Sequence, residues 1–207
     1  MKAIYPDIQN KMWLVMQSSK TAKTISVEEE GIGEELPFTL FGWVNDDLTI
    51  ICQTSVALLD KKQRFDAIVQ AAVIFRKAWG CTSLSFVAEG FCATDPTAIR
   101  YDQPLAIQFA SGNQTVMECL TVMHVESNSI NILTVPYKYG LGRTVSYGKP
   151  RMYPQNGDTA YSYPTLLRST LGLTPELVPE YSDVFYETII NGLSDIGIEC
   201  HWRDSFG

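Results

Sequence analysis

The chain has 207 residues, of which 45% are hydrophobic and 19% are charged, and its formal net charge is −7. This composition is typical of a globular protein with a sizeable core, and the negative charge argues against broad, nonspecific binding to nucleic acid or to anionic membranes. No apolar run reaches the ~18 residues that a membrane span requires, and polar residues interrupt any secretory leader, so we expect a cytoplasmic protein that does not bind membranes.

Two elements are predicted at the start of the chain. Ile8, Met12 and Val15 recur at helical spacing, which predicts an N-terminal helix within residues 1–17. Residues 18–36 then contain five glutamates and two lysines. A polar, strongly charged composition of this kind favours a solvated acidic linker between the helix and the rest of the domain.

The core of the domain is expected within residues 37–138. Its first part is interpreted as a hairpin, because β-branched and aromatic residues fill Pro37–Val44 and Leu48–Thr54 on either side of a polar turn. Asp60–Trp79 carries an apolar stripe, begins with a capping-box pair and is followed by Gly80. These three signals together predict a long amphipathic helix.

The second part of the core is interpreted as a strand, a short helix and another hairpin. Apolar and small polar residues alternate over Leu84–Ala88, which predicts a strand, and Gln103–Ala110 suits a short helix. Val116–Glu126 and Ile130–Tyr137 flank a short polar segment. This arrangement predicts a second hairpin.

The C-terminal part of the chain shows weaker signals. Residues 139–163 have little periodicity and are expected to form a long loop. Residues 164–207 are expected to form a C-terminal helical segment of the same domain. Within it, Thr174-Pro175-Glu176 resembles a helix start, and Asp183–Asp195 has the spacing of a closing helix before a short terminal strand.

Together these elements predict a single α+β domain. We expect a mixed or antiparallel sheet of about five strands, with one long helix packed across it and helices at both termini. The order helix, hairpin, helix, strand, hairpin resembles that of profilin-like and roadblock-like folds, which are often dimeric or scaffolding modules. Likeness at the level of element order does not define a function.

One stretch of the chain resembles a known group of proteins. Phe65–Pro96 reads FDAIVQAAVIFRKAWGCTSLSFVAEGFCATDP and contains SFVAEGF followed by TDP. This run is similar to one found in uncharacterised proteins of tailed bacteriophages. The resemblance covers about a sixth of the chain and implies a phage-encoded protein that acts in the host cytoplasm. It implies no activity and no functional residues.

The sequence contains no established catalytic or cofactor motif. Short Cys or His pairs that would indicate structural zinc are missing, as are the nucleophile elbow and the dinucleotide and phosphate-loop fingerprints. We therefore expect neither a cofactor nor a metal, and we interpret the five widely spaced cysteines as reduced core thiols. If the protein is an enzyme, the candidates are Glu89 at a strand end, Asp95 behind it, and His124, which would suit a hydrolase or metal-dependent enzyme.

A basic, tyrosine-rich segment departs from the acidic character of the chain. Pro136–Pro164 contains four basic residues, one aspartate and six of the ten tyrosines. Tyrosine with arginine suits protein interfaces, and the same pair can stack on single-stranded nucleic acid and neutralise its phosphates. A surface loop whose tyrosines pack onto the core is the third interpretation. The candidate binding residues are Tyr137, Lys138, Tyr139, Arg143, Tyr147, Lys149, Arg151 and Tyr153.

These observations favour a non-enzymatic protein-interaction or assembly protein. It would bind a protein partner, or a second copy of itself, through the basic, tyrosine-rich segment. One alternative is a nucleic-acid-binding accessory protein that uses the same segment, and the other is the enzyme outlined above. No partner or substrate can be named from the residues.

Overall fold

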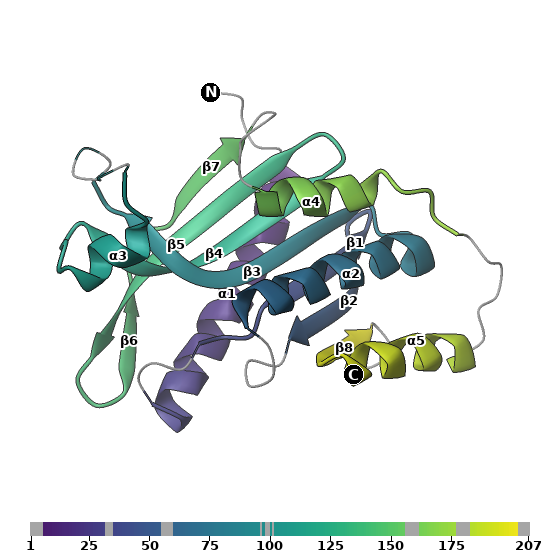
Figure 1. Cartoon of the computed structure of the whole chain (residues 1–207), viewed down its shortest axis with the longest axis horizontal. Coiled ribbons are helices and arrows are strands. Elements are labelled where there is room, and N and C mark those ends of the chain that lie inside the picture. Colours follow the sequence, from purple (N-terminus) through teal and green to yellow (C-terminus); the bar gives the residue numbers. More distant parts are fainter. Residues whose placement is uncertain are drawn as a thin grey trace.

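The computed structural model describes residues 6–31, 35–54, 60–95, 97, 100, 102–155, 162–176 and 183–202. Within these residues eight antiparallel strands form one sheet and five helices lie around it (Figure 1), which confirms the predicted α+β class. The elements are α1 (Pro6–Glu29), β1 (Thr39–Val44), β2 (Asp47–Thr54), α2 (Lys61–Trp79), β3 (Ser83–Ala93), α3 (Leu105–Ala110), β4 (Val116–Glu126), β5 (Ile130–Gly140), β6 (Thr144–Tyr147), β7 (Arg151–Gln155), α4 (Ser162–Leu171), α5 (Asp183–Asp195) and β8 (Ile198–Trp202).

The sheet is larger than the sequence predicted. Its strands follow the order β6-β5-β4-β3-β1-β2-β8, and β7 also pairs with β5. The β6 and β7 strands pair with β5 one after the other along the same edge. Between these two paired stretches, the Gly148 N–H donates to the Pro136 carbonyl on that edge. The predicted loop over residues 139–163 is therefore wrong as far as Gln155. These strands form because they pair with β5. Their own residues show no clear alternation of apolar and polar side chains, so the sequence did not reveal them.

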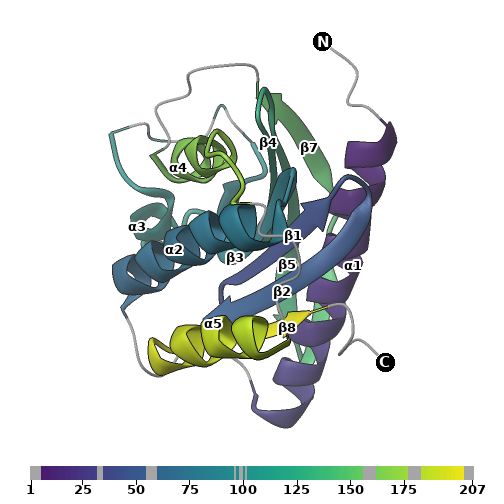
Figure 2. The ribbon, with the colours of Figure 1, turned by 90° about the vertical axis from the view of Figure 1, so that its right-hand side faces the viewer.

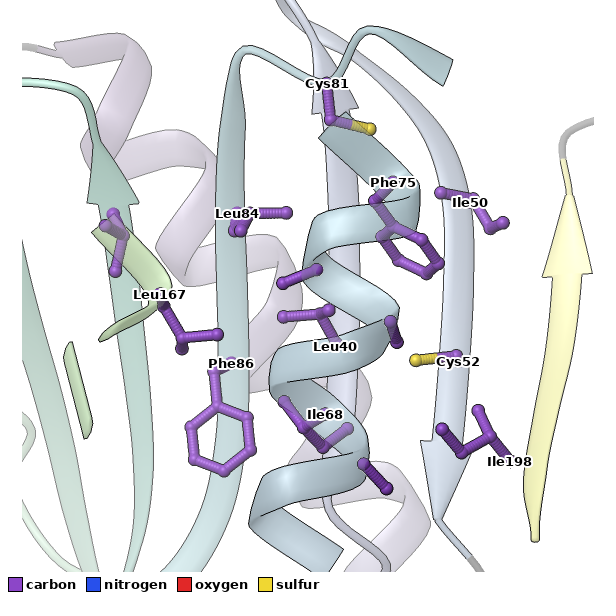
Figure 3. Packing of buried hydrophobic residues seen from close by; sticks show 14 of the residues in the cluster. Leu40, Ile50, Cys52, Ile68, Phe75, Cys81, Leu84, Phe86, Leu167 and Ile198 are labelled. Carbon is purple, nitrogen blue, oxygen red and sulfur yellow. The ribbon is translucent and has the colours of Figure 1, made fainter. Parts of the chain in front are cut away.

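The α2 helix packs on one face of the sheet, together with α4 and α5 (Figure 2). Its local signals are those that the sequence showed: Asp60 and Gln63 form a reciprocal capping box, and Gly80 ends the helix with a φ of 66°. Ile68 and Phe75 point from α2 into the apolar layer above the strands (Figure 3). The strand backbone approaches this helix closely, because a Cβ on Gly42 would lie 2.8 Å from the Phe75 ring.

The α1 helix covers the opposite face of the sheet (Figure 2). The sequence predicted one long helix across the sheet and helices at both termini, but it did not indicate that the N-terminal helix forms a layer on the second face. The predicted acidic linker over residues 18–36 is also wrong in its first part, because α1 continues to Glu29. Lys23 and Val27 are both fully buried and extend the buried stripe of the helix toward its C-terminal end. A buried lysine breaks the apolar pattern by which a helix is recognised, so the sequence hid this half of α1.

The predicted hairpins are present, and both have two-residue turns. In the first, Val44 pairs with Asp47 across Asn45, which has a φ of 56°. In the second, the Glu126 N–H donates to the Ser129 carbonyl at 2.9 Å. Asparagine tolerates the left-handed conformation better than other non-glycine residues, which explains its place in the first turn.

The C-terminal segment differs from the prediction at one point. Residues 174–176 are not helical, although they resembled a helix start. The Glu176 N–H instead donates to the Lys77 carbonyl at 3.1 Å, and the Glu176 carboxylate pairs with the Lys77 ammonium. The expected continuation after Glu176 lies outside the described residues. Among those that are described, no helix is both long and apolar enough to cross a membrane.

Candidate functional site

A buried ion pair joins α1 to the sheet near its tyrosine-rich end. Lys23 has no exposed surface, and its Nζ lies 2.8 Å from Glu89 Oε1. The Tyr137 hydroxyl donates to Glu89 Oε2 at 2.9 Å, and the Leu36 N–H donates to Glu89 Oε1 at 3.2 Å. A buried charge is tolerated only when it is paired and hydrogen-bonded, and both carboxylate oxygens of Glu89 meet that condition.

Aromatic rings surround the lysine of this pair. Lys23 Nζ lies 5.4 Å from the centre of the Tyr137 ring and 5.6 Å from that of Tyr139. Burial lowers the pKa of Lys23, but the hydrogen bond and the negative charge of Glu89 outweigh burial, so the pKa is raised overall. Burial and the Glu89 charge also raise the pKa of Tyr137, so its hydroxyl stays protonated and donates.

A cavity of about 540 Å³ opens beside this cluster. Its volume lies within the range of about 300–1,000 Å³ that is typical of ligand sites. Residues of the turn after α3, of the first part of β4 and of the last part of β5 line it. They are Phe109, Gly112, Asn113, Gln114, Val116, Met117, Glu118, Tyr137, Lys138 and Tyr139.

Glu118 is the half-buried carboxylate of this cavity. Burial raises its pKa, the nearby Glu89 carboxylate raises it further, and the positive charge of Lys23 lowers it in part. Lys23 already forms its ion pair with Glu89. The carboxylates of Glu89 and Glu118 thus lie near two lysines, the buried Lys23 that pairs with Glu89 and the exposed Lys138 that lines the cavity.

The β5–β6 hairpin projects beside the C-terminal end of α1 (Figure 1), and three residues of its first strand, Tyr137, Lys138 and Tyr139, line the cavity. Leu141 stands in its turn with 98% of its surface exposed. Arg143, with a φ of 57°, donates to the carbonyls of Glu28 and Glu29 at the end of α1. The Tyr147 hydroxyl donates to the Lys20 carbonyl at 2.8 Å. These bonds fix the hairpin on α1 and leave the Leu141 side chain in solvent.

The eight predicted binding residues have three kinds of surroundings. Three of them, Tyr137, Lys138 and Tyr139, line the cavity. Arg151 is engaged internally, because it donates to the carbonyls of Ala93 and Thr94 at 3.0 and 2.9 Å. The remaining members lie along the hairpin and the next strand. They are Arg143 and Tyr147, which bond to α1, Lys149, which is exposed, and Tyr153, which pairs with Ile132.

The three candidate catalytic residues do not come together. Glu89 pairs with Lys23, and Asp95 is an exposed turn residue that accepts two bonds from Thr97. His124 stands opposite Ser85 in the sheet, four residues along β3 from Glu89, which places it about 13 Å away. No group of His, Cys, Asp or Glu within the described part of the chain could hold a metal ion.

His124 belongs to a second buried polar cluster. The Trp43 indole N–H donates to Ser85 Oγ at 3.0 Å, and Ser85 Oγ lies 2.8 Å from His124 Nδ1. The other ring nitrogen of His124 is 3.8 Å from Glu126, which is too far for a hydrogen bond. Burial lowers the pKa of His124. Ser85 is fully buried, so the cluster joins the strands without presenting a nucleophile.

No protein-family model, no curated protein and no solved structure matches this chain. The functional argument therefore depends on the site itself. Sequence reasoning missed two charged members of the site, Lys23 and Glu118. The one available signal was the position of Lys23, which falls four residues before Val27 and seven after Met16 on the buried side of α1.

Proposed function

We propose that the protein is a non-enzymatic interaction or assembly protein whose binding surface consists of the β5–β6 hairpin and the cavity at its base. The observation that carries the proposal is Leu141, a large apolar side chain that is 98% exposed in a hairpin bonded to α1. Exposed apolar side chains are common one at a time. Here Phe109 and Ile107 add exposed apolar surface on the neighbouring α3, at 40% and 54% exposure.

The partner is a protein, or a second copy of this chain. Exposed apolar groups rimmed by polar ones are typical of protein interfaces, and β6, the second strand of the hairpin, stands at the end of the strand order of the sheet. The proposal includes the phage origin and the host cytoplasm that the resemblance of residues 65–96 implies. The profilin-like element order supports it by analogy, because modules of that class often act as scaffolds.

The contacts of the hairpin are less suited to a nucleic-acid role. Stacking of bases requires open aromatic faces, whereas Tyr137 is buried against Lys23 and the Tyr147 hydroxyl is bonded to α1. Neutralising phosphates requires free basic groups, whereas Arg143 and Arg151 donate to backbone carbonyls. An enzymatic role lacks an assembled set of catalytic groups, since Glu89, Asp95 and His124 stand apart.

The test compares two leucine variants of the full chain. Leu141→Glu places a charge in the hairpin turn, and Leu14→Glu places the same charge on the exposed side of α1 as a matched control. Sedimentation velocity of the purified protein and cross-linking in a host lysate would report self-association and partners. We expect Leu141→Glu to remove the association and Leu14→Glu to preserve it.

Two outcomes would contradict the proposal. In the first, the unmodified protein is a strict monomer and captures no partner. In the second, both variants weaken association equally, which would place the interface elsewhere. Anisotropy measurements with labelled oligonucleotides at low salt complete the test, because tight binding that weakens steeply with salt would favour nucleic acid instead.

A further inference from the structure

The sheet opens at the cavity, where two neighbouring strands stop pairing with each other. The β4–β5 ladder runs from Val125–Ile130 to Cys119–Pro136 and ends there. Both strands continue beyond that point, β4 back to Val116 and β5 on to Gly140. Among the described residues, β4 pairs in this region only with β3, and β5 pairs with β6 on its outer side. The two inner edges thus face each other, and their residues line the cavity.

The backbone groups of β5 can be assigned to edges from one hydrogen bond. The Gly148 N–H donates to the Pro136 carbonyl at 2.8 Å, so the carbonyl of Pro136 points to the outer edge of β5. In an antiparallel strand successive residues direct their N–H and C=O groups to opposite edges. Tyr137 and Tyr139, which are one and three residues after Pro136, therefore direct their N–H and C=O groups to the inner edge, toward the cavity.

The same alternation applies to β4. Val135 precedes Pro136, so its backbone groups point inward to its partner Leu120. Glu118, two residues before Leu120, consequently directs its own N–H and C=O groups into the gap. A sheet edge of this kind is a template for another strand, and here two such edges face each other.

The charged residues beside the gap indicate which side chain an incoming strand would place there. Glu118 shares the neighbourhood of Glu89, and the buried lysine of the cluster is already paired with Glu89. A basic side chain of an incoming strand would form an ion pair with the half-buried Glu118 carboxylate, next to the exposed Lys138.

We propose that the gap between β4 and β5 is a slot for an extended peptide segment of a partner protein, which adds a strand between the two edges and places an arginine or lysine beside Glu118. The inference rests on the proposed interaction function and specifies its mode of recognition. Strand addition obtains affinity from backbone hydrogen bonds and specificity from alternate side chains. A small molecule would use the side chains of the cavity and leave both backbone edges unpaired.

The first test measures the side-chain preference of the slot. The probes are four fluorescein-labelled nonapeptides of alternating Val and Thr, with Arg, Lys, Gln or Glu at the central position. We expect the Arg and Lys peptides to bind at least about tenfold more tightly than the Glu peptide, as one charge-assisted hydrogen bond would give. Glu118→Gln should remove this preference. Glu126→Gln, at the other end of β4 and also half-buried, is the matched control and should preserve it.

The second test measures the use of both backbone edges. Each amide of the Arg peptide is N-methylated in turn, because methylation removes one hydrogen-bond donor and leaves the side chain in place. Insertion between two edges uses the donors of adjacent residues, so methylation at either of two neighbouring central positions should weaken binding. Addition to a single edge would show the effect only at alternate positions, and binding by side chains alone would show none. Amide hydrogen exchange at Glu118, Tyr137 and Tyr139 should slow when the peptide binds.

Several outcomes would overturn the inference. They are the absence of binding by every peptide up to about 1 mM, a preference that Glu118→Gln leaves unchanged, and a methylation pattern confined to alternate positions. If Leu141→Glu still abolishes partner association in that case, the interaction function stands and the slot is rejected. If the unmodified protein neither associates nor binds any of these peptides, both proposals fail.

Discussion

The two faces of the sheet bury different kinds of groups. The face under α2 is filled by apolar side chains from α2, α4, α5 and the strands. The face under α1 has an apolar centre as well, but it also buries Lys23 with Glu89 and, further along, His124 with Ser85. An apolar layer needs only volume and shape, whereas each buried polar group needs a partner at hydrogen-bond distance. The candidate site adjoins the second face, where these partners come from distant parts of the chain.

The largest effect is expected from breaking the ion pair of the α1 face. Lys23→Met leaves the Glu89 carboxylate buried without its lysine, which should lower the free energy of unfolding by about 3–5 kcal/mol. Urea denaturation followed by circular dichroism would measure it. Lys20→Met, three residues earlier and partly exposed on the same helix, is the control and should change stability far less.

The double variant Lys23→Met with Glu89→Gln sharpens this result. Glutamine removes the unpaired charge and keeps an oxygen that can accept from Leu36 or Tyr137. We expect it to recover most of the loss. A double variant as unstable as Lys23→Met alone would show that packing around the lysine stem, and not the unpaired charge, causes the destabilisation.

A smaller effect is expected from overpacking the α2 face. A Cβ on Gly42 would lie 2.7–2.8 Å from Cys81, Ile50 and Phe75, so Gly42→Ala forces the core to shift. We expect a loss of about 1–3 kcal/mol in thermal or urea unfolding. Gly90→Ala is the matched strand control, because a Cβ there meets no atom within 4 Å. Equal losses in the two variants would mean that glycine flexibility, and not close packing, matters at position 42.

The next effect concerns the helix start on the α2 face. Asp60→Ala removes the side chain that accepts from the Gln63 N–H, and it should cost about 1 kcal/mol in chemical denaturation. Asp66→Ala, an exposed position inside the same helix, is the control for loss of one negative charge. A cost at position 60 no larger than at position 66 would contradict a capping role.

The last effect is a pH dependence on the α1 face. Burial lowers the pKa of His124 below its ordinary value of 6.5, so the unfolded chain takes up a proton before the folded protein does. Stability should therefore fall as the pH drops below 6.5, by at most about 1.4 kcal/mol per pH unit. The groups that face this ring are Ser85, Trp43, Glu126 and Lys11.

Two histidine variants separate this contribution from other titrations. His124→Gln should flatten the dependence of unfolding free energy on pH between 7.5 and 5.5. His201→Gln changes an exposed histidine and should leave that dependence as it is. An unchanged slope in His124→Gln would assign the acid sensitivity to other groups.

The sequence by itself was sufficient for the elements whose signals are local. The capping box of Asp60 and Gln63, the stop at Gly80 and the apolar stripe of α2 all lie within one helix, and the structure reproduces them. Both hairpins were also predictable, because a polar turn and its flanking strands are adjacent in the chain. Of the site, the sequence indicated Tyr137, Lys138 and Tyr139, which line the cavity.

Only the tertiary structure determined the rest of the site. The second half of α1 depends on Lys23, whose burial is stabilised by a glutamate from β3. The β6 and β7 strands depend on pairing with β5, and the cavity exists because β4 and β5 stop pairing after Pro136. Each of these features is an interaction between segments far apart in sequence. The free energy of such an interaction depends on which groups the fold brings together. The periodic pattern of residues within one segment does not contain that information.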